Sequence, residues 1–374
     1  MADNELSDIL QIMMTDGVGP VTFYKYLQTY NGSLTKTISA IAQKKKLCSK
    51  DKATEEIERA AKLGVKIITY KDAVYPESLR QLNDAPPILY ALGNTDLLSH
   101  PVSMAIVGAR NASINGRKIA SRIAYDLTEN DVLTISGMAR GIDSAAHKGA
   151  MYAKNKLGPT IAVLGTGIDV VYPAENKDIY KMIAEQGLII SELPFGTVAQ
   201  ISTFPRRNRI ISALSAGTLV VEASLHSGSL ITAKCALEQG KDIFAVPGSP
   251  LENRSQGPNH LIKEGAILTE NAEDILNILS INQNQQIKSS QLSLKPLDKV
   301  ENRVNISDIK ISEPLPNKEN NSSLIELITF EGVDIDELLR SSGLMQADFF
   351  SQLLDLEFNG KIERQVGNRV ARLR

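Results

Sequence analysis

The chain has 374 residues and a formal net charge of −2, with 43% hydrophobic and 22% charged residues. This length predicts two or three domains, and the hydrophobic content is enough for a sizeable core. The near-neutral charge excludes a histone-like polycation but not a nucleic-acid-binding protein, because a local groove can be basic on a neutral molecule.

Several classes of protein are excluded by single features. The two cysteines, Cys48 and Cys235, are too few for a disulfide framework or a cysteine-based zinc cluster. The first 16 residues are acidic and lack the basic start of a signal peptide. The longest apolar stretch, residues 210–225, contains Glu222 with several serines and glycines, so it does not predict a membrane span. We therefore expect a soluble, cytoplasmic protein that does not associate with membranes.

Four regions follow one another along the chain. Residues 1–100 have the pattern of short helices and turns, and residues 101–280 alternate strands with helices. Residues 281–320 are rich in Asn, Gln, Ser, Lys and Pro, a composition that cannot bury a core and predicts a flexible linker. Residues 322–374 return to helical periodicity and carry 9 acidic against 6 basic side chains, which disfavours DNA binding by this tail alone.

The second region repeats one unit, in which a short apolar run ends at a loop containing Gly or Ser and a helix follows. Continuous apolar runs between helices are typical of buried parallel strands, so we predict a doubly wound α/β sheet. Such sheets bind ligands at the carboxyl ends of their strands. The expected strands are Val102–Val107, Val132–Ile135, Thr160–Leu164, Leu188–Ile190, Thr218–Val221 and Asp242–Val246.

The loops after the first two strands share one chemistry. The first contains Gly108 and Arg110, and the second runs Ser136-Gly137-Met138-Ala139-Arg140-Gly141 before a helix that begins at Ile142. Glycines expose backbone N–H groups, helix N-termini carry partial positive charge, and arginines add donors, so each loop suits a phosphate. Either loop alone is better explained as a tight turn, but two such neighbours favour an anion site.

Three arginines and an asparagine follow an aromatic residue at the start of a later helix, in the run Phe204-Pro205-Arg206-Arg207-Asn208-Arg209. An exposed aromatic beside arginines is typical of proteins that bind single strands through stacking and phosphate contacts. The alternative is that Phe204 belongs to the core and that some arginines pair with Glu192 or Glu222. We expect at least one of the three arginines to be paired in this way.

The next loop and helix start, Ser227-Gly228-Ser229 with Thr232 and Lys234, also present hydroxyl groups and N–H groups that suit phosphate. A plain helix N-cap explains Ser229 equally well.

Signals for nucleotide cofactors and for catalysis are weak. Gly165-Thr166-Gly167 lacks the third glycine of G-x-G-x-x-G, and no P-loop motif occurs. Asp143 and His147 are spaced i, i+4, which predicts a hydrogen-bonded structural pair because no nucleophile or metal cluster accompanies them. We expect no enzyme activity, no cofactor and no metal.

Many ordered segments of the chain resemble the family of DNA-processing protein A, the DprA/Smf family. They cover residues 104–266 in order without a large gap. The matching segments are AIVGAR with Ser113 and Gly116, SGMARGID with Ala146-His147, TIAVLGTGIDVVYPAEN, ISELPFGT, FPRRNRIISALS, VVEA, SGSLITA, FAVPGSP and NHLIKEGA.

The resemblance implies an extended Rossmann-like domain over residues 71–280. It would bind and protect single-stranded DNA, form homodimers and help load the RecA recombinase during natural transformation and recombination, without catalysis. Gly108 and Arg110 would hold one phosphate, with the loop Ser136 to Gly141 beside it. Some relatives place a lysine where this chain has Ala174. The positive pocket would be completed by Phe204, Arg206, Arg207, Asn208, Arg209, Ser227, Gly228, Ser229, Thr232 and Lys234.

The flanks resemble the family's other domains less closely. Residues 1–70 would form a sterile-alpha-motif-like helical domain, in which Gly17-Val18-Gly19-Pro20 is either a helix-hairpin-helix-like turn before helix Val21–Tyr30 or a simple turn between helices. Residues 281–321 would be the linker, and residues 322–374 a winged helix. Its helices are expected near 323–330, 335–342 and 346–358. They precede a hairpin of Lys361–Val366 and Arg369–Leu373 around Gly367-Asn368.

Two other classes of function compete with DNA binding. Rossmann-like nucleotide phosphoribohydrolases carry a PGGxGTxxE motif, but the corresponding run from Ser215 to Glu222 lacks the paired glycines. A hydrolase is therefore the weaker alternative. A pure protein-interaction scaffold leaves the loops of arginine and glycine unexplained.

Overall fold

The computed structural model describes residues 2–154 and 159–280 and, near the C-terminus, residues 328, 333–342, 349, 352–353, 356–357, 361–365 and 369–372. The chain divides into two compact units, Met1–Lys295 and Pro296–Arg374.

A nine-stranded sheet organises the first unit, in the order β1-β2-β6-β5-β4-β3-β7-β8-β9. Its centre is six parallel strands, and all six strands predicted from apolar runs are confirmed within one or two residues. The order places the first predicted strand in the middle, so the chain winds outward in both directions from β3 and makes an extended Rossmann-like fold. These strands are β3 Ser103–Val107, β4 Leu133–Ser136, β5 Thr160–Val163, β6 Leu188–Ser191, β7 Gly217–Val220 and β8 Asp242–Ala245.

Three further strands extend the sheet at its edges. The prediction of only helices and turns over residues 1–100 is wrong, because β1 (Lys66–Thr69) and β2 (Ile88–Gly93) lie there. β2 runs antiparallel to both β1 and β6, so these strands belong to no strand-helix repeat. At the other edge β9 (Ile267–Leu268) runs parallel to β8.

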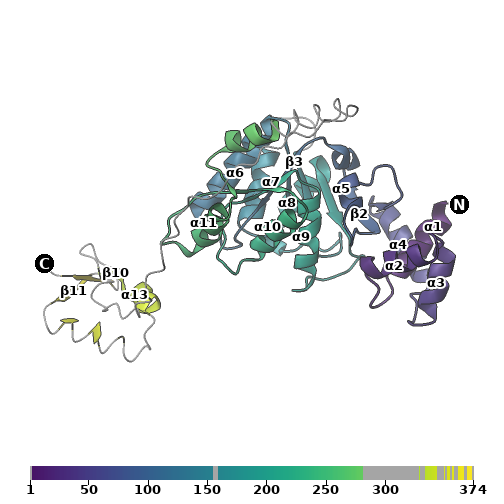
Figure 1. Ribbon diagram of the computed structural model, residues 1–374, viewed down its shortest axis with the longest axis horizontal. Helices are drawn as coiled ribbons and strands as arrows, with labels where there is room; N and C mark the ends of the chain where they lie inside the picture. Colours follow the sequence, from purple (N-terminus) through teal and green to yellow (C-terminus); the bar gives the residue numbers. More distant parts are fainter. Residues whose placement is uncertain are drawn as a thin grey trace, which may run out of the picture. The chain divides into compact units, whose positions relative to one another are not determined.

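Helices cover both faces of the parallel sheet (Figure 1). Successive strand residues point to opposite faces, so Ile106 packs with helices α6 and α7 while Val107 packs with α9, α10 and α11. The helices around the sheet are α5 Glu77–Arg80, α6 Ile114–Glu129, α7 Ile142–Met151, α8 Lys177–Gln186, α9 Thr203–Ala213, α10 Gly228–Glu238 and α11 Gln256–Lys263. Short 3₁₀ helices lie at η1 Thr95–Ser99, η2 Ala174–Asn176 and η3 Asn253–Ser255.

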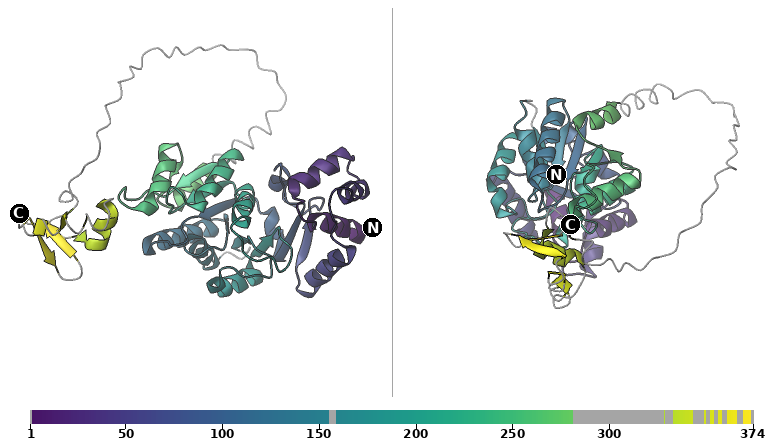
Figure 2. Two further views of the ribbon diagram at one scale, coloured as in Figure 1. Left: turned by 90° about the horizontal axis from the view of Figure 1, so that it is seen from below. Right: turned by 90° about the vertical axis from the view of Figure 1, so that its left-hand side faces the viewer.

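Four helices at the N-terminus gather at the end of the sheet formed by β1 and β2 (Figures 1 and 2). Their fully buried side chains, among them Leu10 and Phe23, join one core with Tyr90 of β2. The turn before the second helix contains Gly17 with φ +71°, a conformation that glycine adopts at little cost. Lys45 donates a 3.0 Å hydrogen bond to the Gly17 carbonyl. The helices are α1 Ala2–Met13, α2 Pro20–Thr29, α3 Leu34–Ala42 and α4 Lys50–Lys62.

The second unit contains a small antiparallel sheet and a helix with a hydrophobic core of its own. The expected hairpin is confirmed as β11 (Ile362–Gln365) and β12 (Arg369–Arg372), with Arg364 opposite Val370. β10 (Val333–Asp334) pairs with β12 and was not predicted, whereas helix α13 (Ile335–Ser342) was. The expected linker 281–321, the turn Gly367-Asn368 and nearly all of the expected helix 323–330 lie outside the described residues.

Candidate functional site

A pocket of about 300 Å³ opens at the carboxyl ends of β3, β4 and β5. It borders β3, next to which the strand order reverses, at the carboxyl-end edge where ligands bind doubly wound sheets. Its walls come from the loops after these three strands and from the start of α9. The lining residues are Arg110, Asn111, Gly137, Ala139, Arg140, Leu164, Gly165, Thr166, Tyr172, Pro173, Phe204 and Arg207.

The first two loops of the predicted site pack directly on each other. Gly141 has φ +76°, and a Cβ on it would lie 2.2 Å from the Ala109 carbonyl oxygen. A Cβ on Gly108 would lie 2.6 Å from the Ile142 side chain. Ser136 is buried and donates a 2.6 Å hydrogen bond to the Ile106 carbonyl. These three predicted site residues therefore lie beneath the pocket and hold its loops in place.

Arg207 lies under the loop after β4, Ser136 to Gly141, and forms part of the floor of the pocket. Its guanidinium donates a 2.7 Å hydrogen bond to the Val163 carbonyl and lies against Gly137, where a Cβ would be 1.7 Å from Nη1. Burial lowers the pKa of Arg207 to about 10, and the charge of Asp143 acts in the opposite direction. Asp143 in turn accepts hydrogen bonds from the backbone N–H groups of Gly137 and Ala139, at 3.2 and 3.3 Å. A buried charge pair thus supports the loop from inside the protein.

Phe204 forms a wall of the pocket together with two neighbours. Its half-buried ring lies 4.9 Å from the guanidinium carbon of Arg110 and 5.5 Å from the ring centre of Tyr172. An exposed cation over an aromatic face is a stabilising arrangement, and here both groups border the same cavity. A residue that precedes a proline is biased toward an extended backbone, but Phe204 lies in the first turn of α9, where a following proline is tolerated.

The other residues of the arginine cluster do not line the pocket. Arg209 is buried and pairs with Glu192 at 2.5 Å and with Asp84 at 3.0 Å, which confirms that at least one arginine is structural. Arg206 is exposed. Asn208 is buried and donates a 3.2 Å hydrogen bond to the Gly228 carbonyl, which ties α9 to the start of α10.

The predicted residues of α10 also lie apart from the pocket lining. Ser227 caps the helix by accepting a hydrogen bond from the Ser229 backbone N–H, and the two hydroxyl groups lie 2.7 Å apart. Thr232 is buried, whereas Lys234 is exposed and lies 3.9 Å from Glu238.

One expectation about a carboxylate changes with the structure. Asp143 and His147 do not bond to each other, because Asp143 faces the loop and His147 contacts the Thr160 hydroxyl at 2.8 Å. Burial lowers the pKa of His147 to about 3, so the ring is neutral at ordinary pH. Glu222 is buried, accepts hydrogen bonds from the hydroxyl and backbone N–H of Ser113, and does not line the pocket.

The sequence alone did not identify the third loop as a wall of the pocket. Tyr172 and Pro173, joined by a cis peptide, line it together with Gly165 and Thr166. The signal was available, because this loop follows the third parallel strand at the same edge of the sheet. Ala174, at the position where some relatives carry lysine, is exposed.

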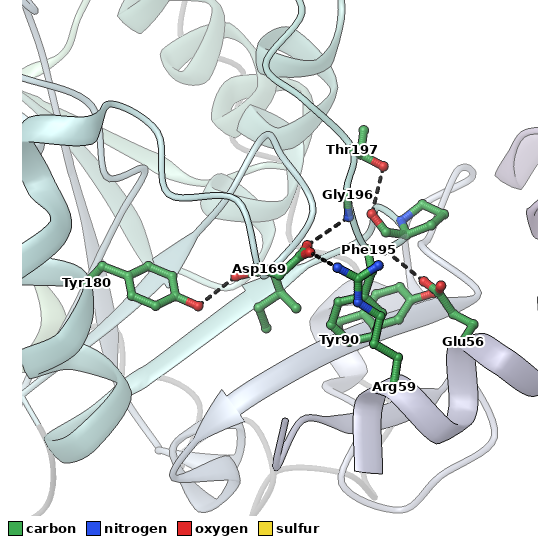
Figure 3. Close-up of polar contacts among 10 residues, drawn as sticks. Glu56, Arg59, Tyr90, Asp169, Tyr180, Phe195, Gly196 and Thr197 are labelled. Atoms are coloured by element: carbon green, nitrogen blue, oxygen red, sulfur yellow. Dashed lines mark hydrogen bonds and ion pairs between the residues drawn. The ribbon is translucent and has the colours of Figure 1, made fainter. Parts of the chain in front are cut away.

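Helix α4 holds this third loop from the N-terminal side (Figure 3). Arg59 pairs with Asp169 at 2.7 Å, and Asp169 also accepts a 2.8 Å hydrogen bond from the Gly196 N–H. The buried carboxylate of Glu56 accepts hydrogen bonds from the Tyr90 hydroxyl, at 2.9 Å, and from the Phe195 N–H, at 2.7 Å. The loops after β5 and β6 are therefore bonded both to each other and to α4.

Within the part of the chain that the structure describes, no group of three or more His, Cys, Asp or Glu side chains is placed to hold a metal ion. Over the same residues, no helix has the length and apolar character needed to cross a membrane.

Two protein families match the chain. Residues 66–280 match DNA recombination-mediator protein A, and residues 313–368 match the DprA winged helix domain. Among curated proteins, DNA processing protein DprA of Streptococcus pneumoniae is 45% identical over 205 residues, which are 55% of this chain and 71% of that protein. Protein Smf of Escherichia coli is 36% identical over 297 residues, which are 79% of this chain and 74% of that protein.

Two solved structures have a similar fold. The X-ray structure of DNA processing protein A from Streptococcus pneumoniae has a TM-score of 0.64 and 33% identity, covering 74% of this chain and 98% of that one. A structure of DNA processing protein A from Helicobacter pylori, described for its single-stranded DNA binding mode, has a TM-score of 0.53 and 31% identity. It covers 58% of this chain and 97% of that chain.

Proposed function

The chain belongs to the family of DNA recombination-mediator protein A, with the DprA and Smf proteins, and on that premise we propose that it processes DNA in recombination by binding single-stranded DNA. The observation that carries the proposal is the pocket at the carboxyl ends of β3, β4 and β5, where Arg110 and Arg140 border two aromatic rings. The single-stranded DNA binding mode described for the Helicobacter pylori relative supports it as well.

The pocket offers separate partners for the two parts of a nucleotide. Arg110 and Arg140 are exposed and present donors for phosphate oxygens, while the ring of Phe204 beside Tyr172 offers a face for a base. Arg140 lies 3.6 Å from Glu175, but both side chains are 61% exposed, so this pair leaves the guanidinium available. Stacking and phosphate contacts tolerate any base, so the binding we propose has no sequence preference.

The remaining predicted site residues receive different roles in this proposal. Gly108, Ser136, Gly137 and Gly141 shape the loops, and Arg207 supports them from the floor of the pocket. Arg209 and Asn208 hold α9 in place, whereas Arg206, Ser227 to Thr232 and Lys234 would meet only parts of a strand that extend beyond the pocket.

Binding can be measured by fluorescence anisotropy with a labelled oligonucleotide as a single strand and as the same sequence in a duplex. We expect preference for the single strand and a logarithmic salt dependence with a slope of about −0.7 per phosphate neutralised. Equal affinity for the duplex, or affinity that does not change with salt, would contradict the proposal. The oligonucleotide should be recovered intact, because we propose binding without catalysis.

On the basis of family membership we also propose that the protein forms a homodimer through the Rossmann-like domain. In the cytoplasm this dimer would protect incoming single-stranded DNA and help load RecA recombinase. These steps are tested separately from binding itself. Light scattering at several protein concentrations measures the dimer. Nuclease protection and RecA filament formation on DNA precoated with a single-strand-binding protein measure the other two.

A further inference from the structure

A second concave surface lies between helices α6 and α7, with a volume of about 540 Å³. It shares no lining residue with the pocket at the strand ends. We call it the α6–α7 groove and define it by a floor of Ser121, Ala145 and Gly149 between longer side chains from both helices.

The floor of the α6–α7 groove is fixed by a close crossing of the two helices. A Cβ on Gly149 would lie only 2.1 Å from the Ser121 carbonyl oxygen, so the backbones meet at this point. Ala145 is buried beside them. Because the small residues keep the floor low, the long side chains on either side stand up as walls, and the hollow is built into the helix packing.

The walls carry cations and tyrosines without a lining carboxylate. Arg117, Lys118 and Arg122 come from α6 and Lys148 from α7, whereas the region 101–280 as a whole has 17 basic and 17 acidic residues. Lys118 and Lys148 are exposed and form no ion pair with any residue that the structure describes. Arg122 pairs with Asp126 at 2.7 Å, but its side chain is 77% exposed, so the pair is weak.

Two tyrosines of the groove provide apolar surface beside these charges. Tyr125 of α6 is half-buried, and Tyr152 at the end of α7 is 72% exposed. Cations that follow a groove together with aromatic faces are the combination that single-stranded nucleic acids require, for phosphates and bases respectively. An acidic peptide would use the cations but would gain little from an exposed tyrosine face.

The groove begins next to the pocket. The loop that carries Arg110 leads into α6, and the loop that carries Arg140 leads into α7. Arg117 donates a hydrogen bond to the carbonyl of Ala112, in the first of these loops. From Ser144 to Tyr152 the groove follows α7 for about 12 Å at 1.5 Å per residue. That length suits about three phosphates at the spacing of roughly 3.4 Å along a stacked strand.

We propose that the α6–α7 groove binds the stretch of single-stranded DNA that continues from the pocket, with Lys118 and Lys148 contacting its phosphates and Tyr152 contacting a base. This inference rests on the proposed function, since it extends the same strand. It predicts a difference between short and long oligonucleotides that the pocket alone does not.

The test uses the full chain with the double charge reversal Lys118→Glu/Lys148→Glu. The matched control is Lys52→Glu/Lys62→Glu, two exposed lysines of α4 with the same change in net charge. Anisotropy is measured with an oligonucleotide of about 2 nucleotides, short enough to stay within the pocket, and with one of about 20 nucleotides.

We expect the groove variant to bind the long oligonucleotide about tenfold more weakly than the control does, with a salt slope reduced in magnitude by about 1.4, for two lost phosphate contacts. The short oligonucleotide should bind both variants alike. Tyr152→Ala should weaken the long oligonucleotide without changing its salt slope.

The opposite outcomes are distinct. Equal affinity of both variants for the long oligonucleotide overturns the groove and leaves the pocket standing. A wild-type chain that binds neither oligonucleotide overturns the proposed function and the groove together. Loss of binding to polyglutamate, with DNA binding unchanged, would show that the groove holds an acidic protein segment instead.

Discussion

At the scale of single residues, the pocket depends on groups that do not reach solvent. Arg207 is 5% exposed, and its guanidinium fills the space that a side chain at position 137 would occupy. Its buried Nε has no hydrogen-bond partner among the described residues, so the side chain carries a desolvation cost that Asp143 and the Val163 carbonyl offset. Charge in this pocket is thus partly structural, which the count of arginines does not reveal.

Gly137→Ala should destabilise the protein by about 1–3 kcal/mol, because the new methyl group forces the Arg207 guanidinium away from the Val163 carbonyl. Urea unfolding measures the change. Gly228→Ala is the matched control, since nothing lies within 4 Å of a Cβ there. Equal midpoints for the two variants would show that Arg207 moves aside freely.

Arg110→Ala and Phe204→Ala should each weaken single-strand binding, by about 1.5–3 and 1–3 kcal/mol respectively. Because the guanidinium lies over the ring, each change also disturbs the other partner. The double variant should therefore lose less than the sum of the two, with a coupling of about 0.5 kcal/mol or more. Additive losses in a titration by anisotropy would mean that the two side chains act independently.

His147 should make stability depend on pH. The buried ring has a pKa of about 3 when folded, against an ordinary value of 6.5, so below pH 6.5 the unfolded chain binds a proton that the folded chain does not. Stability should therefore fall as pH drops from 6.5, by up to about 1.4 kcal/mol per pH unit. Urea unfolding between pH 5 and 7.5 should show this slope. It should flatten in His147→Asn but persist in His260→Asn, whose side chain is 53% exposed. An unchanged slope in His147→Asn would assign the effect to other groups.

At the scale of elements, helix α4 connects the N-terminal helices to the loops after β5 and β6. Its contribution comes from one face, where the buried Glu56 carboxylate accepts two hydrogen bonds and Arg59 lies 5.2 Å from the Phe195 ring centre. The contacts of Glu56 and Arg59 with Phe195 join segments more than 100 residues apart in sequence. The wall of the pocket on this side is therefore part of a larger packed body.

Glu56→Gln should destabilise the first unit by about 1–3 kcal/mol. Both donors bond the same oxygen, Oε1, so the amide oxygen can take its place, but the two hydrogen bonds then lose the negative charge of the carboxylate, which roughly doubles the strength of such bonds. Glu58→Gln, an exposed change on the same helix, is the control for the loss of one negative charge. Chemical denaturation in which both variants match wild type would show that Glu56 is dispensable for this contact.

The sequence predicted the elements of the parallel sheet well and the orientation of site side chains poorly. Buried parallel strands appear as apolar runs, so β3 to β8 could be located, whereas β1 and β2 form an antiparallel edge whose pairing is set by tertiary contacts. The loops of the pocket followed from the ends of those strands. The sequence does not distinguish the three arginines of the cluster. In the structure Arg206 is exposed, Arg207 lies under Gly137, and Arg209 pairs with two carboxylates. Only the packing around α9 separates them.

At the scale of the whole molecule, the pocket and the α6–α7 groove both lie in the first unit, Met1–Lys295. The second unit has its own hydrophobic core, and its sequence from residue 322 is net acidic. The first unit is therefore better suited than the second to bind DNA, which is a polyanion.

A chain that ends at Lys295 should fold and keep its single-strand affinity within about tenfold, or about 1.4 kcal/mol, of the full chain. Circular dichroism during heating and anisotropy with the same oligonucleotide measure the two properties. A larger loss from a chain that still unfolds cooperatively would place a principal DNA contact in the winged helix.

The contact between Gly137 and Arg207 also limits which substitutions can accumulate at these two positions during evolution. A side chain at position 137 and a long one at position 207 exclude each other, and a shorter residue at position 207 alone gives up the hydrogen bond to the Val163 carbonyl, so a change at either position alone weakens the loop. Relatives that carry alanine or serine at the first position should have a shorter residue at the second, and such paired exchanges should arise through an intermediate of lower fitness. The pocket floor would then change in rare double steps, while the exposed rim around Arg140 varies one residue at a time.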